Sequence, residues 1–138
     1  MAFAKATLQT AFQYDLPDVY VKIGTEPEKR LRIANVCIAN GRYFGGGMKI
    51  APDAQLNDGL FDVVTLGNFS TAEILLNSYR LYLGTHLGLD KVALARASRV
   101  DARPAEDGVE VMMEVDGETP GRLPASFEIL PQALAVRC

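Results

Sequence analysis

Apolar and polar residues alternate along much of this chain with the period of two that β-strands produce. Five segments carry this strand pattern, at residues 19–24, 60–67, 91–102, 109–115 and 122–138. They are rich in β-branched and aromatic residues, and turn-forming residues separate them. Pro124 and Pro131 interrupt the last segment, which indicates one or two strands at edges or corners. The pattern predicts a mostly β domain, an antiparallel β-sandwich more than a barrel.

A sixth segment, "LRIANVCIA" at residues 31–39, is apolar on both of its alternating faces. Leu31, Cys37 and Ala39 point one way in an extended chain, and Val36 and Ile38 point the other. Strands of this kind are usually covered on both sides. We therefore expect 31–39 to be a single central strand of a sheet.

Two segments have helical periodicity instead. Residues 2–14 place several apolar side chains on one face, and Pro17 ends that segment because the residue before a proline avoids the α region. Ser70 and Glu73 form the sequence pattern of a capping box, which predicts a second helix that ends between residues 84 and 88. Its apolar residues at helical spacing are expected to pack in the core: Ile74, Leu75, Tyr79, Tyr82 and Leu83. The predicted fold is a single domain over residues 1–138, a β-sandwich with two helices.

Composition narrows the class of protein. The chain has 138 residues, 49% of them hydrophobic and 22% charged, which suits one globular domain. No apolar run reaches the roughly 18 residues of a membrane span. The net charge of −3, without a block of Lys or Arg, argues against a nucleic-acid partner. Two cysteines without metal-type spacing predict a reduced, cytoplasmic setting.

The lone histidine limits the choice of chemistry. A Ser-His-Asp triad would need His86, and the chain has no GxSxG motif. We expect His86 to lie at the surface or at a helix end.

The stretch "ANGRYFGGGMKIAPDAQLNDGLFD", residues 39–62, holds more backbone-permissive residues than one turn needs. The glycine triplet at 45–47 fits neither the P-loop nor the GxGxxG pattern. It predicts the close approach of another backbone or of a ligand, or a bulge in a strand. Arg42 and Lys49 flank it, so an anion such as a phosphate is one candidate ligand.

Three Asp-Gly pairs follow, and each could be no more than a tight hairpin turn. Asp107-Gly108 is interpreted in that way. Asp116-Gly117-Glu118 places two carboxylates around a glycine at the end of a strand, which could hold a base, a metal ion or both.

Asp58-Gly59 belongs to an oxygen-rich set with Asp53, Gln55 and Asn57. The set fails the calcium-loop pattern, because Asp58 stands where glycine is required and Val64 where a bidentate Glu is required. Two interpretations stay open for Asp58. It turns the chain, or it binds Mg²⁺ together with backbone carbonyls and water.

Three motifs in this order and spacing carry a family resemblance: "NGRYFGGGMKIAPDAQLNDGLFDVV", "MEVDGE" and "LPASFEILPQAL". From about residue 3 to its end, the chain resembles the C-terminal domain of the diacylglycerol kinase and sphingosine kinase superfamily, in particular the bacterial soluble lipid kinases. The resemblance implies an ATP- and Mg²⁺-dependent kinase that transfers the γ-phosphoryl group to a lipid hydroxyl. Phosphoryl transfer of this kind depends mainly on positioning and on charge stabilisation.

The resemblance also implies roles for individual residues. Asp116 matches the proposed general base, and Glu118 matches its acidic partner, which with Gly117 lies close to the nucleotide and the metal. Asp58 matches a carboxylate that binds a structural Mg²⁺. Main-chain oxygens at the positions of Gln55 and Leu60 complete that metal site in related kinases.

The chain departs from the family pattern because it has no Gly-Gly-Asp-Gly signature and none of the strands that usually precede "FAKATLQTAF". ATP would bind mainly through that other domain, so we expect the isolated chain to be inactive. The alternative is a remnant that binds a lipid or a protein without catalysis. An unpaired sheet edge would favour a homo-oligomer. The expected setting is cytoplasmic with transient membrane contact, and the acceptor, a lipid or less plausibly a nicotinamide dinucleotide, is left open.

Overall fold

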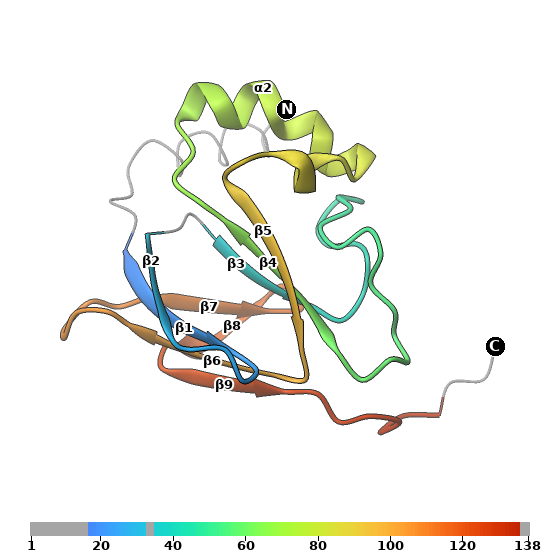
Figure 1. Ribbon diagram of the computed structural model, residues 1–138, viewed down its shortest axis with the longest axis vertical. Coiled ribbons are helices and arrows are strands. Elements are labelled where there is room, and N and C mark those ends of the chain that lie inside the picture. Colours follow the sequence, from blue (N-terminus) through green and yellow to red (C-terminus); the bar gives the residue numbers. More distant parts are fainter. Residues whose placement is uncertain (1–16, 33–34, 136–138) are drawn as a thin grey trace.

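The computed structural model describes residues 17–32 and 35–135 (Figure 1). The helix expected at residues 2–14 lies outside the described residues. The described elements are β1 (Asp18–Ile23), β2 (Lys29–Arg32), β3 (Asn35–Ala39), β4 (Phe61–Leu66), α2 (Thr71–Leu83), the 3₁₀-helix η1 (His86–Gly88), β5 (Val92–Ala97), β6 (Arg99–Pro104), β7 (Met112–Val115), β8 (Glu118–Arg122) and β9 (Ala125–Glu128). The prediction of a mostly β, antiparallel, sandwich-like domain is confirmed.

The strands form three antiparallel groups. One sheet has the order β2-β1-β6-β9, a second has the order β3-β4-β5, and β7 and β8 form a separate hairpin. The two sheets lie in different layers in Figure 1, with α2 on the far side of the three-stranded sheet. Val63 and Val64 in β4 are both fully buried and belong to different hydrophobic cores, one that includes β1 and β6 and one that includes residues 50–54. The central strand that is covered on both faces is therefore β4.

The prediction of one central strand over residues 31–39 is wrong. Its first part belongs to β2, at the edge of the four-stranded sheet, and its second part is β3, at the edge of the three-stranded sheet. Leu31 packs against the same core as Val36 and Ile38, whereas Cys37 and Ala39 face the other core. Residues that a single extended strand would put on one face thus belong to two sheets, which no alternation pattern can reveal.

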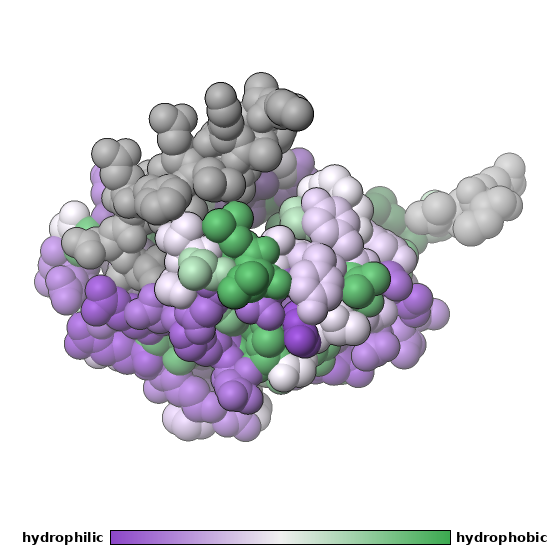
Figure 2. Space-filling model, turned by 90° about the horizontal axis from the view of Figure 1, so that it is seen from above, coloured by the Kyte–Doolittle hydropathy of each residue, from purple (hydrophilic) through white to green (hydrophobic). Residues whose placement is uncertain are grey.

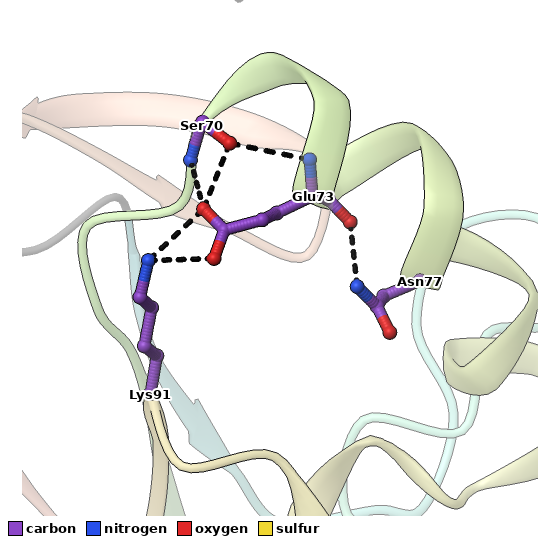
Figure 3. Close-up of polar contacts among 4 residues, drawn as sticks. All are labelled: Ser70, Glu73, Asn77 and Lys91. Atoms are coloured by element: carbon purple, nitrogen blue, oxygen red, sulfur yellow. Dashed lines mark hydrogen bonds and ion pairs between the residues drawn. The ribbon is translucent and has the colours of Figure 1, made fainter.

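The start of α2 matches the sequence pattern. The Ser70 hydroxyl accepts a hydrogen bond from the Glu73 amide, and the Glu73 carboxylate accepts one from the Ser70 amide at 2.7 Å (Figure 3). Lys91 Nζ donates to both oxygens of the same carboxylate, at 2.7 and 2.9 Å. The helix ends at Gly84, whose left-handed φ of 73° favours glycine. These contacts bind the start of α2 to the segment that enters β5.

Glu73 should make stability depend on pH in an acidic window. Its hydrogen bonds from Lys91, followed by those from Ser70, lower its pKa to about 2 from the usual 4.5. A depressed folded-state pKa means that this stabilisation is complete above the unfolded-state value and is lost as the pH falls through the folded-state value. Glu73→Gln keeps an acceptor at the cap but removes the charge. We expect urea unfolding of this variant to change less between pH 4.5 and pH 2 than that of the parent chain.

The control for this experiment is Glu114→Gln. The Glu114 side chain is exposed and has no hydrogen bond or ion pair within residues 17–32 and 35–135. Its replacement should leave the pH dependence of unfolding unchanged. Parallel pH profiles for Glu73→Gln and the parent chain would show that the ion pair with Lys91 contributes nothing to stability.

The prediction that the apolar stripe of α2 packs in the core is wrong. The five residues of that stripe are exposed by 41 to 63%: Ile74, Leu75, Tyr79, Tyr82 and Leu83. The helix instead contacts the core beneath it through Leu81. Figure 2 looks onto the side of the molecule that carries α2 and shows apolar atoms at its surface. Helical spacing identified a stripe but not the side that faces the sheet.

The connections also differ in part from expectation. Asp107-Gly108 does form a turn, with Gly108 at a φ of 82°, but it joins β6 to β7, which lie in different groups of strands. It is therefore not a hairpin. Of the one or two strands expected in residues 122–138, β9 is confirmed, whereas β8 lies almost entirely before that segment, and Pro124 lies between the two strands in a cis peptide bond.

Candidate functional site

The β7–β8 hairpin carries the first pair of candidate residues. Val115 pairs with Glu118 across the hairpin, so Asp116 and Gly117 form a two-residue loop. Their φ angles are 51° and 85°, the combination of a type I′ turn, which explains the Asp-Gly sequence. The register shifts between Met113 and Val115, and irregularities of this kind redirect side chains near a strand end. The base of the hairpin is fixed by a hydrogen bond from the Leu123 amide to the Val111 carbonyl, at 2.9 Å.

The carboxylates at this tip have no counter-charge. Asp116 and Glu118 are exposed, and neither side chain makes a hydrogen bond or ion pair with any described residue. The same holds for Glu114, two residues before the turn. The nearest basic residue of the hairpin, Arg122, is already paired with Glu110. The hairpin tip is thus a negatively charged element that is open to solvent, as a proton acceptor or a site for a hydrated cation requires.

The second candidate region is the loop that precedes β4. Asp58 forms an Asx-type turn, because its Oδ1 accepts a hydrogen bond from the Leu60 amide at 3.0 Å. Gly59 follows with a φ of 73°. The turn interpretation of Asp58-Gly59 is therefore correct, and it leaves the second carboxylate oxygen for another partner. Gln55 and Asn57 line a shallow hollow of about 500 Å³ beside this turn.

The second oxygen of the Asp58 carboxylate pairs with Arg96, a residue that the sequence pattern did not identify. Arg96 pairs with Asp58 Oδ2, and its Nε lies 3.3 Å from Asp62 Oδ1. Asp62 is directly opposite Arg96 in the β4–β5 ladder. The only signal in the sequence is the charged residue inside the apolar strand "LFDVVTLG".

Asp62 is the most deeply buried carboxylate among the described residues, with its side chain 3% exposed. Its Oδ2 is buried and has no hydrogen-bond partner. Burial raises the pKa of Asp62, the Arg96 charge opposes that shift, and the nearby Asp58 and Asp53 add to it. One arginine is therefore shared by two carboxylates, and the negative charge at this end of β4 exceeds the positive charge.

These residues fit a hard divalent cation in their donor chemistry. Mg²⁺ prefers carboxylate and carbonyl oxygens and keeps several waters. Asp58 supplies a carboxylate that is 19% exposed, and the loop supplies main-chain oxygens at Gln55 and Leu60. No group of three or more His, Cys, Asp or Glu side chains placed to hold a metal occurs within 17–32 and 35–135. A site here would thus rest on one carboxylate, on carbonyls and on water.

The glycine triplet forms the turn of a tight hairpin. The Phe44 and Met48 backbones exchange two hydrogen bonds, at 3.0 and 3.1 Å, around the three glycines. Gly45 and Gly47 have φ angles of 51° and 93°, which favour glycine. A Cβ on Gly46 or Gly47 would meet no atom within 4 Å. The predicted close approach of another backbone is not found in the described part of the chain.

The basic and histidine side chains near this loop have structural partners. Arg42 Nε donates to the Ala54 carbonyl at 3.0 Å, so it holds the loop together. His86 is 2% exposed, and its Nε2 donates to the Ile50 carbonyl at 3.0 Å, since a carbonyl can only accept. The expectation of a surface histidine is wrong, although His86 does begin the short helix η1. Both residues brace the loop that carries Gln55 and Asp58.

The two candidate regions belong to different groups of strands within the described residues, one to the three-stranded sheet and one to the β7–β8 hairpin. Each region lies at the end of a strand, one before β4 and one between β7 and β8. Among the described helices, none has the length and apolar character needed to cross a bilayer.

Comparisons with known proteins agree with this architecture. A crystal structure of a diacylglycerol kinase from Bacillus anthracis str. Sterne superposes with a TM-score of 0.63 over 90% of this chain and 43% of that one, at 17% identity. The diacylglycerol kinase of Bacillus subtilis is 34% identical over 60% of this chain and 26% of its own length. That of Mycobacterium tuberculosis is 34% identical over 70% of this chain and 30% of its own length. The chain thus spans less than a third of the curated relatives that it matches.

A family model covers the whole chain. The family described as the YegS C-terminal NAD kinase beta sandwich-like domain matches residues 1–138. Together with the kinase relatives and the β-sandwich-like fold, this match shows that the chain is a member of that family, the C-terminal domain of diacylglycerol kinase-like lipid kinases.

Proposed function

We propose that this chain forms one side of the phosphoryl-transfer cleft of an ATP- and Mg²⁺-dependent lipid kinase. The γ-phosphoryl group would pass to a hydroxyl group of a lipid, of which diacylglycerol is the class named for the relatives. The single observation that carries the proposal is the hairpin tip, where Asp116 and Glu118 lie without a counter-charge at a two-residue turn. Asp53, Asp90, Asp107 and Glu114 are also exposed without a side-chain partner among the described residues, but only Asp116 and Glu118 flank the glycine of a hairpin turn.

In the proposed mechanism, Asp116 accepts the proton of the acceptor hydroxyl as that oxygen attacks phosphorus. The type I′ turn sets the direction of the Asp116 Cα–Cβ bond, and exposure would let the carboxylate reach a substrate that is held by another domain. Glu118 and the flanking Gly117 lie on the nucleotide side of the cleft. A bound Mg²⁺ ion would neutralise charge that develops on the transferred phosphoryl group. Asp58, with the main-chain oxygens of Gln55 and Leu60, would hold a structural Mg²⁺ ion that orders the loop.

A phosphate-transfer assay tests whether the 138-residue chain is active by itself. The 138-residue chain, incubated with radiolabelled ATP, Mg²⁺ and diacylglycerol vesicles, is expected to transfer no phosphate, because the nucleotide would bind mainly to residues outside it. A full-length diacylglycerol kinase of the Bacillus subtilis type is the positive control. Transfer of phosphate by the chain alone at a rate near that of the control would contradict the proposal.

A non-catalytic binding module is the second candidate, favoured by the exposed apolar side of α2. Leu76 is 72% exposed and Leu83 is 63% exposed. Exposed apolar surface of this kind is typical of sites that bind a lipid or another protein. Binding of the chain to lipid vesicles or to a protein, together with full activity of an enzyme that lacks Asp116, would favour this candidate over the kinase.

A further inference from the structure

Arg96 forms an ion pair with Asp58, the carboxylate that the proposed metal site would use. Asp58 Oδ1 is engaged by the Leu60 amide, and Asp58 Oδ2 is engaged by the Arg96 guanidinium. A divalent cation that binds to Asp58 must therefore lie beside a positive charge or replace it. Cations a few ångströms apart repel strongly at a partly buried site.

The structure also provides a second place for the arginine. Asp62 lies opposite Arg96 on the neighbouring strand, and Arg96 Nε is already 3.3 Å from Asp62 Oδ1. The other oxygen of Asp62 is buried without a partner. A guanidinium can engage both oxygens of a carboxylate with two parallel N–H donors. Movement of the Arg96 side chain toward its ladder partner Asp62 would pair the unpaired oxygen and free Asp58.

We propose that Arg96 and a divalent cation exchange at Asp58. Without the cation, the guanidinium bridges Asp58 and Asp62. When Mg²⁺ binds to Asp58, the guanidinium leaves that carboxylate and forms a bidentate pair with Asp62. This inference rests on the proposed metal site at Asp58 and assigns a regulatory role to two residues outside the ligand set.

The exchange explains features that the metal ligands alone do not. A buried carboxylate oxygen without a partner costs free energy, so Asp62 destabilises β4 unless it has a compensating role. In the absence of metal, the Arg96 guanidinium offsets the repulsion between Asp58, Asp62 and the nearby Asp53. Arg96 stays within the cluster in both states, so binding of Mg²⁺ adds two positive charges to a group of carboxylates that one guanidinium only partly neutralises.

Titration of the chain with MgCl₂ in a calorimeter tests the exchange. Arg96→Gln removes the competing charge and should tighten Mg²⁺ binding by about tenfold. Asp62→Asn removes the alternative partner, so Arg96 stays on Asp58 and Mg²⁺ binding should weaken by a similar factor. Arg103→Gln is the matched control, since it breaks an arginine–carboxylate pair with Glu28 on the other sheet and should leave binding unchanged.

A double variant controls for the case in which the single variant Arg96→Gln misfolds. Arg96→Gln leaves Asp62 buried without any partner, whereas Asp62→Asn/Arg96→Gln removes both charges and should still bind Mg²⁺ more tightly than the parent chain. The Arg96 Nε–H resonance in a ¹⁵N-labelled sample gives a direct readout. It should shift on addition of Mg²⁺ in the parent chain, and in Asp62→Asn it should shift less.

The outcomes separate the two levels of the proposal. If Asp58→Asn abolishes Mg²⁺ binding but the single and double Arg96 variants bind like the parent chain, the metal site stands and the exchange is wrong. If the parent chain and all variants, Asp58→Asn included, show the same lack of Mg²⁺ binding, the metal site itself is wrong and the exchange falls with it.

Discussion

Replacement of Asp116 by asparagine is expected to lower kcat by about 10²–10⁴-fold in an active enzyme that contains this domain, the range that a general base contributes. Asparagine has nearly the same shape but cannot accept the proton of the acceptor hydroxyl. It also tolerates a positive φ, so the turn with Gly117 should persist. The measurement is steady-state phosphate transfer to diacylglycerol, with folding checked by circular dichroism.

Asp107→Asn is the matched control for that variant. Asp107 also precedes a glycine in an exposed turn and has no hydrogen bond or ion pair within the described residues. Its replacement changes the net charge in the same way but lies in the connection between β6 and β7, so activity should stay near that of the parent. Near-normal turnover by the Asp116→Asn enzyme would show that Asp116 is not the base.

Local features of this fold could be predicted because a few adjacent residues determine them. The Ser70–Glu73 cap depends on two side chains three residues apart, and both reciprocal hydrogen bonds form. The turn at Asp116-Gly117 follows from the need for two positive φ angles in a row. In both cases the interaction that decides the structure is contained in four residues.

Features that depend on pairing between distant strands could not be predicted in the same way. Arg96 and Asp58 are 38 residues apart, and only the β4–β5 register brings the guanidinium to the loop. The division of 31–39 between two sheets likewise depends on which neighbours each half finds. For α2, spacing gave the stripe but not its direction, because Leu81 contacts the core in place of the tyrosines. Local caps and turns were thus more predictable than the partners that distant residues find.

His86→Ala is expected to destabilise the chain by about 2–4 kcal/mol, the cost of a core cavity together with the loss of a buried hydrogen bond. His86 is one of the largest fully buried side chains and the only described one that reaches the Ile50 carbonyl. Its removal leaves that buried carbonyl without its side-chain donor. Urea unfolding at pH 7 measures the change, and Asp90→Ala, at an exposed position close to η1, should shift it by less than about 0.5 kcal/mol.

His86→Phe separates the two causes. It fills most of the volume but cannot donate to Ile50, so it should fall between the parent chain and His86→Ala. Because Ile50 belongs to the loop that also carries Gln55 and Asp58, the alanine variant should bind Mg²⁺ more weakly at a urea concentration where it is still folded. Unfolding midpoints of His86→Ala and the parent chain that coincide would mean that the loop holds its position without the histidine. The bracing of residues 50–58 would then have to come from Arg42 and from the Lys49 amide, which donates to the Leu81 carbonyl at 2.7 Å.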